Sequence, residues 1–191
     1  FYPDGKDEGL VTIDRDPARE IYDIADKELA LLIKEVADTG AHMSVVMDCC
    51  HSGSVTRSVD DFIQLRSRDT HEIHEMRPLE SYLDGYYADL KKSGKHLNIP
   101  TSKHILLAAC ERTQKAYESR KNSGVFTMTM MDVLEKSGGE LSYAELFQRC
   151  RSVVRKYADG QNPQFEAYDS FNPYAGFLGR DIADSSRKFV C

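Results

Sequence analysis

The 191-residue sequence contains no apolar run of about 18 residues, the length that a membrane-spanning helix needs. Its first residues also lack the charged and apolar regions of a signal peptide. A formal net charge of −6 argues against nonspecific binding to nucleic acid. We therefore expect a cytoplasmic protein that binds neither membranes nor nucleic acid.

No Cys-x-x-Cys pair occurs in the sequence, so a structural zinc site is not expected. The cysteine count is odd and the spacing is irregular, which favours a reducing, intracellular compartment. Cys110 ends an apolar run and is expected to be a buried core thiol. The five cysteines are Cys49, Cys50, Cys110, Cys150 and Cys191.

Strand and helix signals alternate along the chain, which is long enough for one domain with a substantial core. Apolar runs predict buried strands at 44–48 and 104–109, and a short strand at 10–13. Loops and an edge strand are predicted in the tail beyond residue 160. This order predicts an α/β fold with a mainly parallel sheet flanked by helices on both faces.

Three helices are predicted from apolar periodicity and end signals. The first spans 26–38, with Asp26 as its cap and Gly40 beyond its end; the second spans 125–136. The third begins at the capping box of Ser142 and Glu145. The expected apolar positions of the three helices are, in order, Leu29, Leu32, Ile33 and Val36; Val125, Phe126, Met130, Met131 and Leu134; and Leu146, Cys150, Val153, Val154 and Tyr157.

The segment 54–103 differs from the rest of the chain in composition. It is polar, weakly periodic and rich in Arg, Asp, Ser and His. A segment of this length between two strands of a compact domain is usually functional or disordered. We therefore expect a long polar insertion or activation loop.

The predicted strand at 44–48 leads into Asp48-Cys49-Cys50-His51-Ser52-Gly53 and so places a thiol at the carboxyl edge of the sheet, where α/β proteins form their sites. A cysteine at a strand end is more often structural than catalytic, but two features favour chemistry. Ser52-Gly53 predicts a tight turn, which can leave N–H groups free to stabilise an oxyanion. Asp48 lies on the same face of the strand as Cys50, where a carboxylate has no core role.

A reactive thiol needs a proton acceptor or a positive neighbour, and none of the six histidines is well placed to serve. His51 would point to the face opposite Cys50. Three others lie in the polar segment: His71, His74 and His96. The last two precede the predicted strands, at the wrong end of the sheet for Cys50: His42 and His104.

Residues 48–53 resemble the Asp-x-Cys-His-Ser-Gly motif of metacaspases, within the caspase-like cysteine peptidases. Further stretches follow in the family's order over most of residues 4–179: Asp4-Gly5-Lys6-Asp7-Glu8-Gly9, Leu106-Leu107-Ala108-Ala109-Cys110 with Gln114-Lys115-Ala116-Tyr117-Glu118, Gly124-Val125-Phe126-Thr127, and Gln161-Asn162-Pro163-Gln164. The resemblance implies a caspase-like domain over 1–182 that lacks its N-terminal portion, with an insertion at 54–103 and a tail at 183–191.

The resemblance also implies roles for the residues of the motif. Cys50 would be the nucleophile and its backbone N–H part of the oxyanion hole, with Cys49 a bystander. Asp48 would lie in the S1 pocket and pair with a basic side chain of a protein or peptide substrate, which implies cleavage after Arg or Lys. No cofactor would carry the chemistry.

The family's base is the histidine of a His-Gly pair, roughly 50 residues before the cysteine. This sequence contains no His-Gly pair and begins with Phe1. The resemblance therefore implies a base upstream of Phe1, on a fragment of the same protein or on another chain. The alternative is a catalytically inactive caspase-like module that binds partners or scaffolds an assembly. A thioredoxin-like role for Cys49-Cys50 is disfavoured by their spacing.

Two further properties of the family bear on this chain. Asp7 and Glu8 could match part of the calcium site of many metacaspases, or simply form a solvated acidic turn. Arg57 and Arg112 stand where calcium-binding members carry acids, which argues against calcium dependence. A peptidase specific for basic residues could also cleave its own insertion, although these arginines could equally be solvating charges: Arg57, Arg66, Arg68 and Arg77.

Overall fold

The computed structural model describes residues 8–49, 66–67, 77–96, 99–111, 113–119, 123–168 and 171–180. The chain divides into two compact units. Unit 1 comprises Phe1–Ala41 and His71–Ser102, and unit 2 comprises His42–Thr70 and Lys103–Cys191. Within the described ranges, no helix has the length and apolar character needed to cross a membrane.

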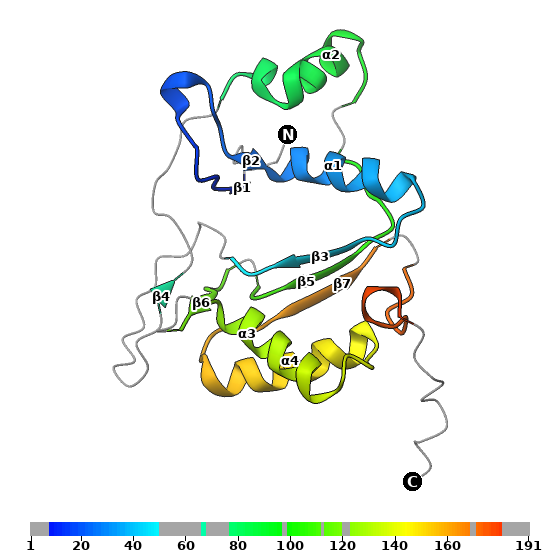
Figure 1. The fold of residues 1–191 in the computed structure, drawn as a ribbon. Coiled ribbons are helices and arrows are strands. Elements are labelled where there is room, and N and C mark those ends of the chain that lie inside the picture. The colour runs from blue at the N-terminus through cyan, green and yellow to red at the C-terminus, as the bar shows by residue number, and fades with distance from the viewer. Residues whose placement is uncertain are drawn as a thin grey trace. The chain divides into compact units, whose positions relative to one another are not determined.

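Unit 2 contains a three-stranded sheet with the order β3-β5-β7 (Figure 1). β3 (Ser44–Met47) runs parallel to β5 (Ile105–Ala108), and β7 (Gln164–Ala167) runs antiparallel to β5. The strands predicted at 44–48 and 104–109 are present, whereas of the strand predicted at 10–13 only Leu10 lies in a strand. The described sheet is mixed rather than mainly parallel. Two helices lie between β5 and β7, and they return the chain to the end at which β5 finishes. β7 therefore starts at that end and runs antiparallel to β5, with Gln164 paired to Ala108.

Two helices of unit 2 follow the sequence expectation: α3 (Val125–Lys136) has the predicted bounds, and α4 (Tyr143–Tyr157) starts at the predicted capping box. Both cover the same face of the sheet (Figure 1). The expectation of helices on both faces stays a prediction. Unit 2 also contains a short antiparallel pair, β4 (Arg66–Ser67) with β6 (Tyr117–Glu118), and a short 3-10 turn, η4 (Phe177–Gly179).

The core of unit 2 lies between the sheet and these helices. Ile105 and Leu107 are fully buried, on one face of β5. Two expected core residues, Met131 and Tyr157, are instead exposed. The side chains that α3 and α4 bury are Phe126, Thr129, Val133, Tyr143, Leu146, Phe147, Cys150 and Val154.

The predicted capping box of α4 is confirmed. Ser142 Oγ accepts a hydrogen bond from the Glu145 N–H at 3.2 Å, and Glu145 Oε2 accepts one from the Ser142 N–H at 2.9 Å. The bond from the Ser142 backbone is the main reason why the pKa of Glu145 lies below its usual value. Each partner satisfies an N–H group that the first turn would otherwise leave free.

Unit 1 begins with the antiparallel pair of β1 (Gly9–Leu10) and β2 (Ile24–Ala25), joined through the 3-10 turn η1 (Pro17–Arg19). α1 (Asp26–Asp38) follows β2 directly and has the predicted bounds. Gly40 lies beyond its end at a φ of +83°, a conformation that favours glycine.

The buried face of α1 differs from the predicted one. Leu32 and Val36 are exposed, whereas Leu31 is buried together with the polar residues Lys27 and Glu28. The cap also differs, because the Glu28 carboxylate reaches back to the Ala25 N–H at 2.9 Å while Asp26 lies inside the first turn. The contacts of Glu28 with Leu83 and Arg77 draw this face inward.

Part of the segment that we expected to be a polar insertion is folded. It contains the 3-10 turns η2 (Leu79–Ser81) and η3 (Leu83–Gly85), followed by α2 (Tyr86–Lys92). Tyr82 and Tyr87 are buried with Ala25 in an apolar cluster. The Tyr87 hydroxyl donates to the Lys27 carbonyl at 2.7 Å, and burial raises the pKa of Tyr87 to about 12.

Glu28 holds this segment against α1. Its Oε1 accepts a hydrogen bond from the Leu83 N–H at 2.9 Å, and its Oε2 forms an ion pair with Arg77. Arg77 also donates to the Asp23 carbonyl at 3.0 Å, and its guanidinium carbon lies 4.0 Å from the centre of the Tyr82 ring. The Glu28 and Arg77 side chains are only 8% and 10% exposed, so the pair is shielded from water.

Glu28→Ala is expected to lower the free energy of unfolding by about 3–5 kcal/mol, because it leaves Arg77 buried without its counter-charge. The control is Asp38→Ala on the same helix, which removes an exposed pair with Lys34. Such surface pairs contribute less than about 1 kcal/mol. Urea unfolding followed by circular dichroism measures both losses, and equal losses would contradict the role given to Glu28.

Candidate active site

The carboxyl ends of β3 and β5 lie at one edge of the sheet of unit 2, because the two strands are parallel and in register. Asp48 and Cys49 follow β3, and Cys110 and Glu111 follow β5. The predicted nucleophile, Cys50, lies outside the described residues. Asp48 and Cys49 are therefore the described residues that come nearest to it in the chain.

Asp48 contacts the beginning of α3. Its Oδ2 accepts two hydrogen bonds from Thr127, one from the backbone N–H at 3.0 Å and one from Oγ1 at 2.6 Å. The other oxygen, Oδ1, is buried and has no hydrogen-bond partner among the described residues. The sequence singled out Asp48 but missed Thr127, which lies 79 residues further along the chain.

Gly124 explains why Asp48 can approach α3 so closely. Gly124 is the N-cap residue of α3 and so has no side chain that could cap the helix itself. Asp48 takes over this function, since it bonds the N–H of the third helical residue as an N-cap side chain would. A Cβ atom on Gly124 would lie 1.8 Å from Asp48 Oδ2, so any larger residue would collide with the carboxylate. A helix start without a capping residue was the one sequence signal for this contact.

Cys110 connects the segments that follow the two strands. It is buried, as predicted, and its thiol lies 3.7 Å from the Cys49 carbonyl oxygen and 3.5 Å from that of Gln114. A thiol is a weak hydrogen-bond donor. The backbone next to Cys50 is thus held toward the segment after β5 by a side chain from the core.

Side-chain amides join the segment after β5 to the segment before β7. Gln161 is buried, and it accepts from the Tyr117 N–H and donates to the Ala109 carbonyl, both at 3.1 Å. Gln114 Oε1 accepts from the Asn162 N–H at 2.8 Å. Glu111 accepts hydrogen bonds from Asn162 and Gln164. Two of the stretches on which the family resemblance rests are therefore in direct contact.

The described histidines of unit 2 lie at the other end of the sheet. His42 and His104 precede β3 and β5, as the sequence indicated. His42 Nε2 lies 2.7 Å from the Tyr143 hydroxyl oxygen, and the His104 ring stacks on Tyr168 at 4.4 Å between centroids. His96 is exposed in unit 1, and His51, His71 and His74 lie outside the described residues. No base for Cys50 is found among the described histidines of unit 2.

The other residues proposed from the family resemblance are only partly described. Asp7, Arg57, Arg68 and Arg112 lie outside the described residues, as does the side chain of Arg66. Across the described ranges, no group of three or more His, Cys, Asp or Glu side chains could hold a metal ion. Because Asp7 lies outside the described residues, the calcium site suggested for Asp7 and Glu8 stays a prediction. Arg77 is described, and its side chain is held in the buried pair with Glu28.

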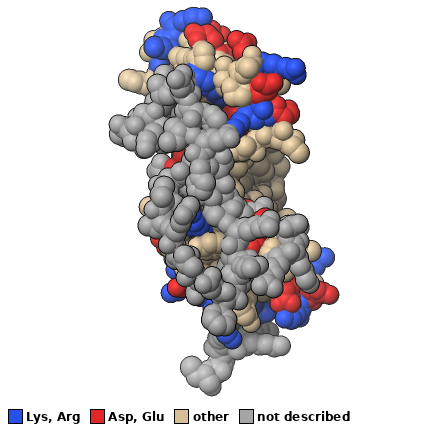
Figure 2. Space-filling model, turned by 90° about the vertical axis from the view of Figure 1, so that its left-hand side faces the viewer, with Lys and Arg blue, Asp and Glu red and all other residues tan. Residues whose placement is uncertain are grey.

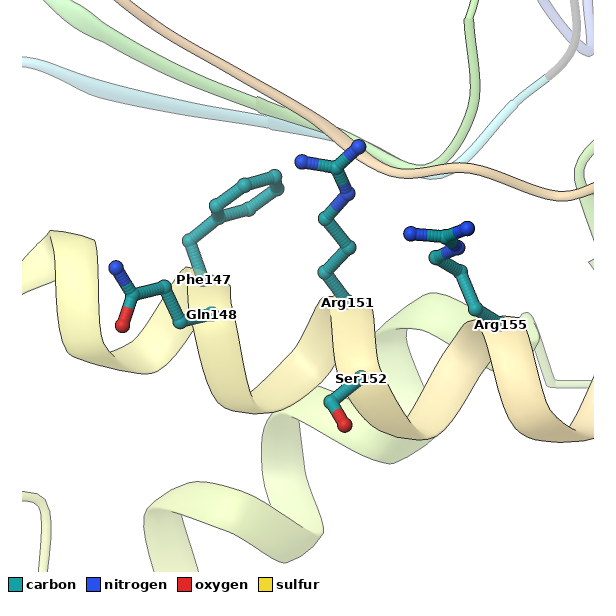
Figure 3. A pocket seen from close by; sticks show the side chains of 5 residues that line it. All are labelled: Phe147, Gln148, Arg151, Ser152 and Arg155. Atoms are coloured by element: carbon teal, nitrogen blue, oxygen red, sulfur yellow. The ribbon is translucent and has the colours of Figure 1, made fainter.

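A hollow of about 320 Å³ lies along α4 (Figure 3). Phe147, Arg151 and Arg155 project from one side of the helix there. Phe147 packs against Phe165 of β7, and Arg151 donates to Asn162 at 2.9 Å. These contacts give the first two side chains structural roles. On the face shown in Figure 2, basic and acidic side chains of the described residues are interspersed, without a continuous field of one sign.

A model of the caspase domain family matches residues 3–172. The chain belongs to this family. Metacaspase-5 of Trypanosoma brucei brucei is 26% identical over 181 residues, which are 90% of this chain and 32% of the metacaspase. The chain thus spans about a third of that relative's length. It is a metacaspase-like member of the caspase family, as the motif around Asp48 predicted.

The crystal structure of a protein from Geobacter sulfurreducens resembles the fold, with a TM-score of 0.56 at 20% identity. The similarity covers 94% of this chain and 62% of that one. At this identity the likeness supports an α/β fold and nothing about chemistry.

Gly124→Ala tests the contact between Asp48 and α3. Because the added Cβ would displace the carboxylate, we expect a loss of about 1–3 kcal/mol in the free energy of unfolding. The same substitution in an Asp48→Ala background should cost much less, since the colliding group is absent and the φ of Gly124, −61°, suits alanine. Urea unfolding of the four proteins measures this coupling. Additive losses would contradict the contact.

Proposed function

We propose that this domain is the peptidase domain of a cysteine endopeptidase that cleaves protein chains after Arg or Lys. The observation that carries the proposal is the Asp48 carboxylate, anchored at the carboxyl end of β3 through one oxygen, with the other buried and unpaired among the described residues. A buried carboxylate oxygen without a partner costs free energy, which a cation of a substrate would offset. Membership of the caspase family supports the thiol chemistry.

In this proposal Cys50 is the nucleophile, and a histidine upstream of Phe1 is the base. The histidine takes the thiol proton, and the thiolate attacks the scissile carbonyl carbon while the Cys50 N–H stabilises the oxyanion. The imidazolium then protonates the leaving amine as the C–N bond breaks, which leaves a thioester on Cys50. The same histidine takes a proton from water, whose oxygen attacks the thioester and releases the acid product and the thiol.

Asp48 sets the substrate preference in this scheme. Its negative charge would pair with the cation of the residue that precedes the cleaved bond. A substrate side chain bound by Asp48 would lie close to Cys50, since only Cys49 separates Asp48 from Cys50 in the sequence. No step requires a metal ion or an organic cofactor.

Self-cleavage within 54–103 is part of the proposal, with Arg57, Arg66 and Arg68 as candidate sites. Arg77 differs from these three because its side chain is buried against Glu28 and Tyr82. Cleavage after Arg77 would therefore require this part of unit 1 to open first, since a peptidase must bind the side chain that it recognises.

Cys50→Ala in the full-length protein is expected to abolish cleavage of a fluorogenic peptide that ends in Arg, because the nucleophile is lost. Cys49→Ala is the matched control and should retain most of the turnover, because its side chain has no part in the proposed chemistry. Unchanged turnover in Cys50→Ala would refute the assignment. A full-length wild-type protein without any turnover would favour the alternative of an inactive binding module.

Asp48→Asn should lower kcat/KM for Arg and Lys substrates by roughly 10- to 150-fold, the range expected when a hydrogen bond to a charged group is lost. The amide keeps an oxygen that can accept from Thr127, so the fold should persist. The control substrate carries citrulline, an uncharged isostere of Arg, and should be cleaved at a similar rate by both proteins. An equal loss on all three substrates would argue against a role for Asp48 in recognition.

A further inference from the structure

Thr127 donates two hydrogen bonds to one carboxylate oxygen of Asp48 and none to the other. A carboxylate has about four lone-pair positions, two on each oxygen. The Thr127 N–H and Oγ1 both donate to Oδ2, at 3.0 and 2.6 Å, and so occupy its two positions. Oδ1 has no partner among the described residues.

The Thr127 hydroxyl is not needed to begin the helix, because the backbone N–H already provides the capping bond. A nearby residue shows the usual alternative for a helical threonine. Thr129 Oγ1 donates to the Val125 carbonyl one turn back, at 2.8 Å. The Thr127 hydroxyl instead turns to Asp48, which suggests that its function lies at the carboxylate.

We propose that Thr127 is a specificity-determining residue, which restricts Asp48 to binding the substrate cation through Oδ1 alone. This inference rests on the proposed function. A guanidinium gains its usual advantage over an ammonium by pairing with both oxygens of a carboxylate at once. With Oδ2 saturated by Thr127, that advantage is reduced, and Arg and Lys are accepted with similar efficiency.

The test compares kcat and KM of the full-length protein on two peptides that differ only in Arg or Lys before the cleaved bond. Thr127→Val has nearly the same shape but lacks the hydroxyl. Its loss leaves one hydrogen-bond position on Asp48 Oδ2 open to the guanidinium of an Arg substrate. We expect the Arg:Lys ratio of kcat/KM to rise about tenfold, mainly through KM, because only Arg gains a second charge-assisted hydrogen bond. Thr127→Ser keeps the hydroxyl and should keep the wild-type ratio.

Thr129→Val is the matched control, because it removes a hydroxyl from the same helix that bonds only to the backbone. Its Arg:Lys ratio should equal that of the wild type. If Thr127→Val does not fold, Thr127→Ala also lacks the hydroxyl and carries the same comparison.

Two results would overturn the inference, and only the second would also overturn the proposed function. If Thr127→Val changes kcat/KM for Arg and Lys by the same factor, Thr127 has a structural role only, and the proposed function stands. If the wild-type protein cleaves neither peptide, the proposed function fails and the inference fails with it.

Discussion

The hydrogen bonds between Asp48 and Thr127 join the end of β3 to the beginning of α3 in unit 2. The first turn of a helix presents N–H groups without intrahelical partners and a partial positive charge, both of which a carboxylate satisfies. Gly124 offers no side chain for this purpose, so the cap comes from a strand end 79 residues before Thr127. The same contact explains why the position must be glycine, since a Cβ there would overlap the carboxylate. The strand that leads to Cys50 is thereby tied to the helix that covers the core.

A capping role and a recognition role for Asp48 do not exclude each other, because a carboxylate has two oxygens. Capping uses Oδ2 and leaves Oδ1 buried and unpaired among the described residues. Asn or Ser caps a helix about as well as Asp does, so the helix alone does not require a charge at this position. The negative charge of Asp48 also suits the partial positive charge at the start of α3. Under the proposed function, the same charge attracts the cation of the substrate.

Features with a local signal in the sequence could be predicted, and contacts between distant segments could not. The bounds of α1 and α3 and the capping box of α4 follow from periodicity and from neighbouring residues. By contrast, Glu28 pairs with a segment about 55 residues away whose polar composition concealed Tyr82 and Tyr87, and this pairing turned a different face of α1 inward. Asp48 was found through its place at a strand end and the family motif. Its partner Thr127 was not, because a threonine in the first turn of a helix is unremarkable.

Both strand pairing and side chains hold the segments around Asp48 in place, since the Ala109 N–H donates to the Met47 carbonyl at 2.8 Å. The buried amide of Gln161 is satisfied on both sides by backbone groups, which fixes the segment after β5. The Cys110 thiol adds only a weak bond to the Cys49 carbonyl. Asp48 in turn anchors the end of β3 to α3 through the two hydrogen bonds that it accepts from Thr127. Under the proposed function, one anchored carboxylate then sets both the substrate and its proximity to the thiol, and proximity of this kind accounts for much of the rate that enzymes achieve.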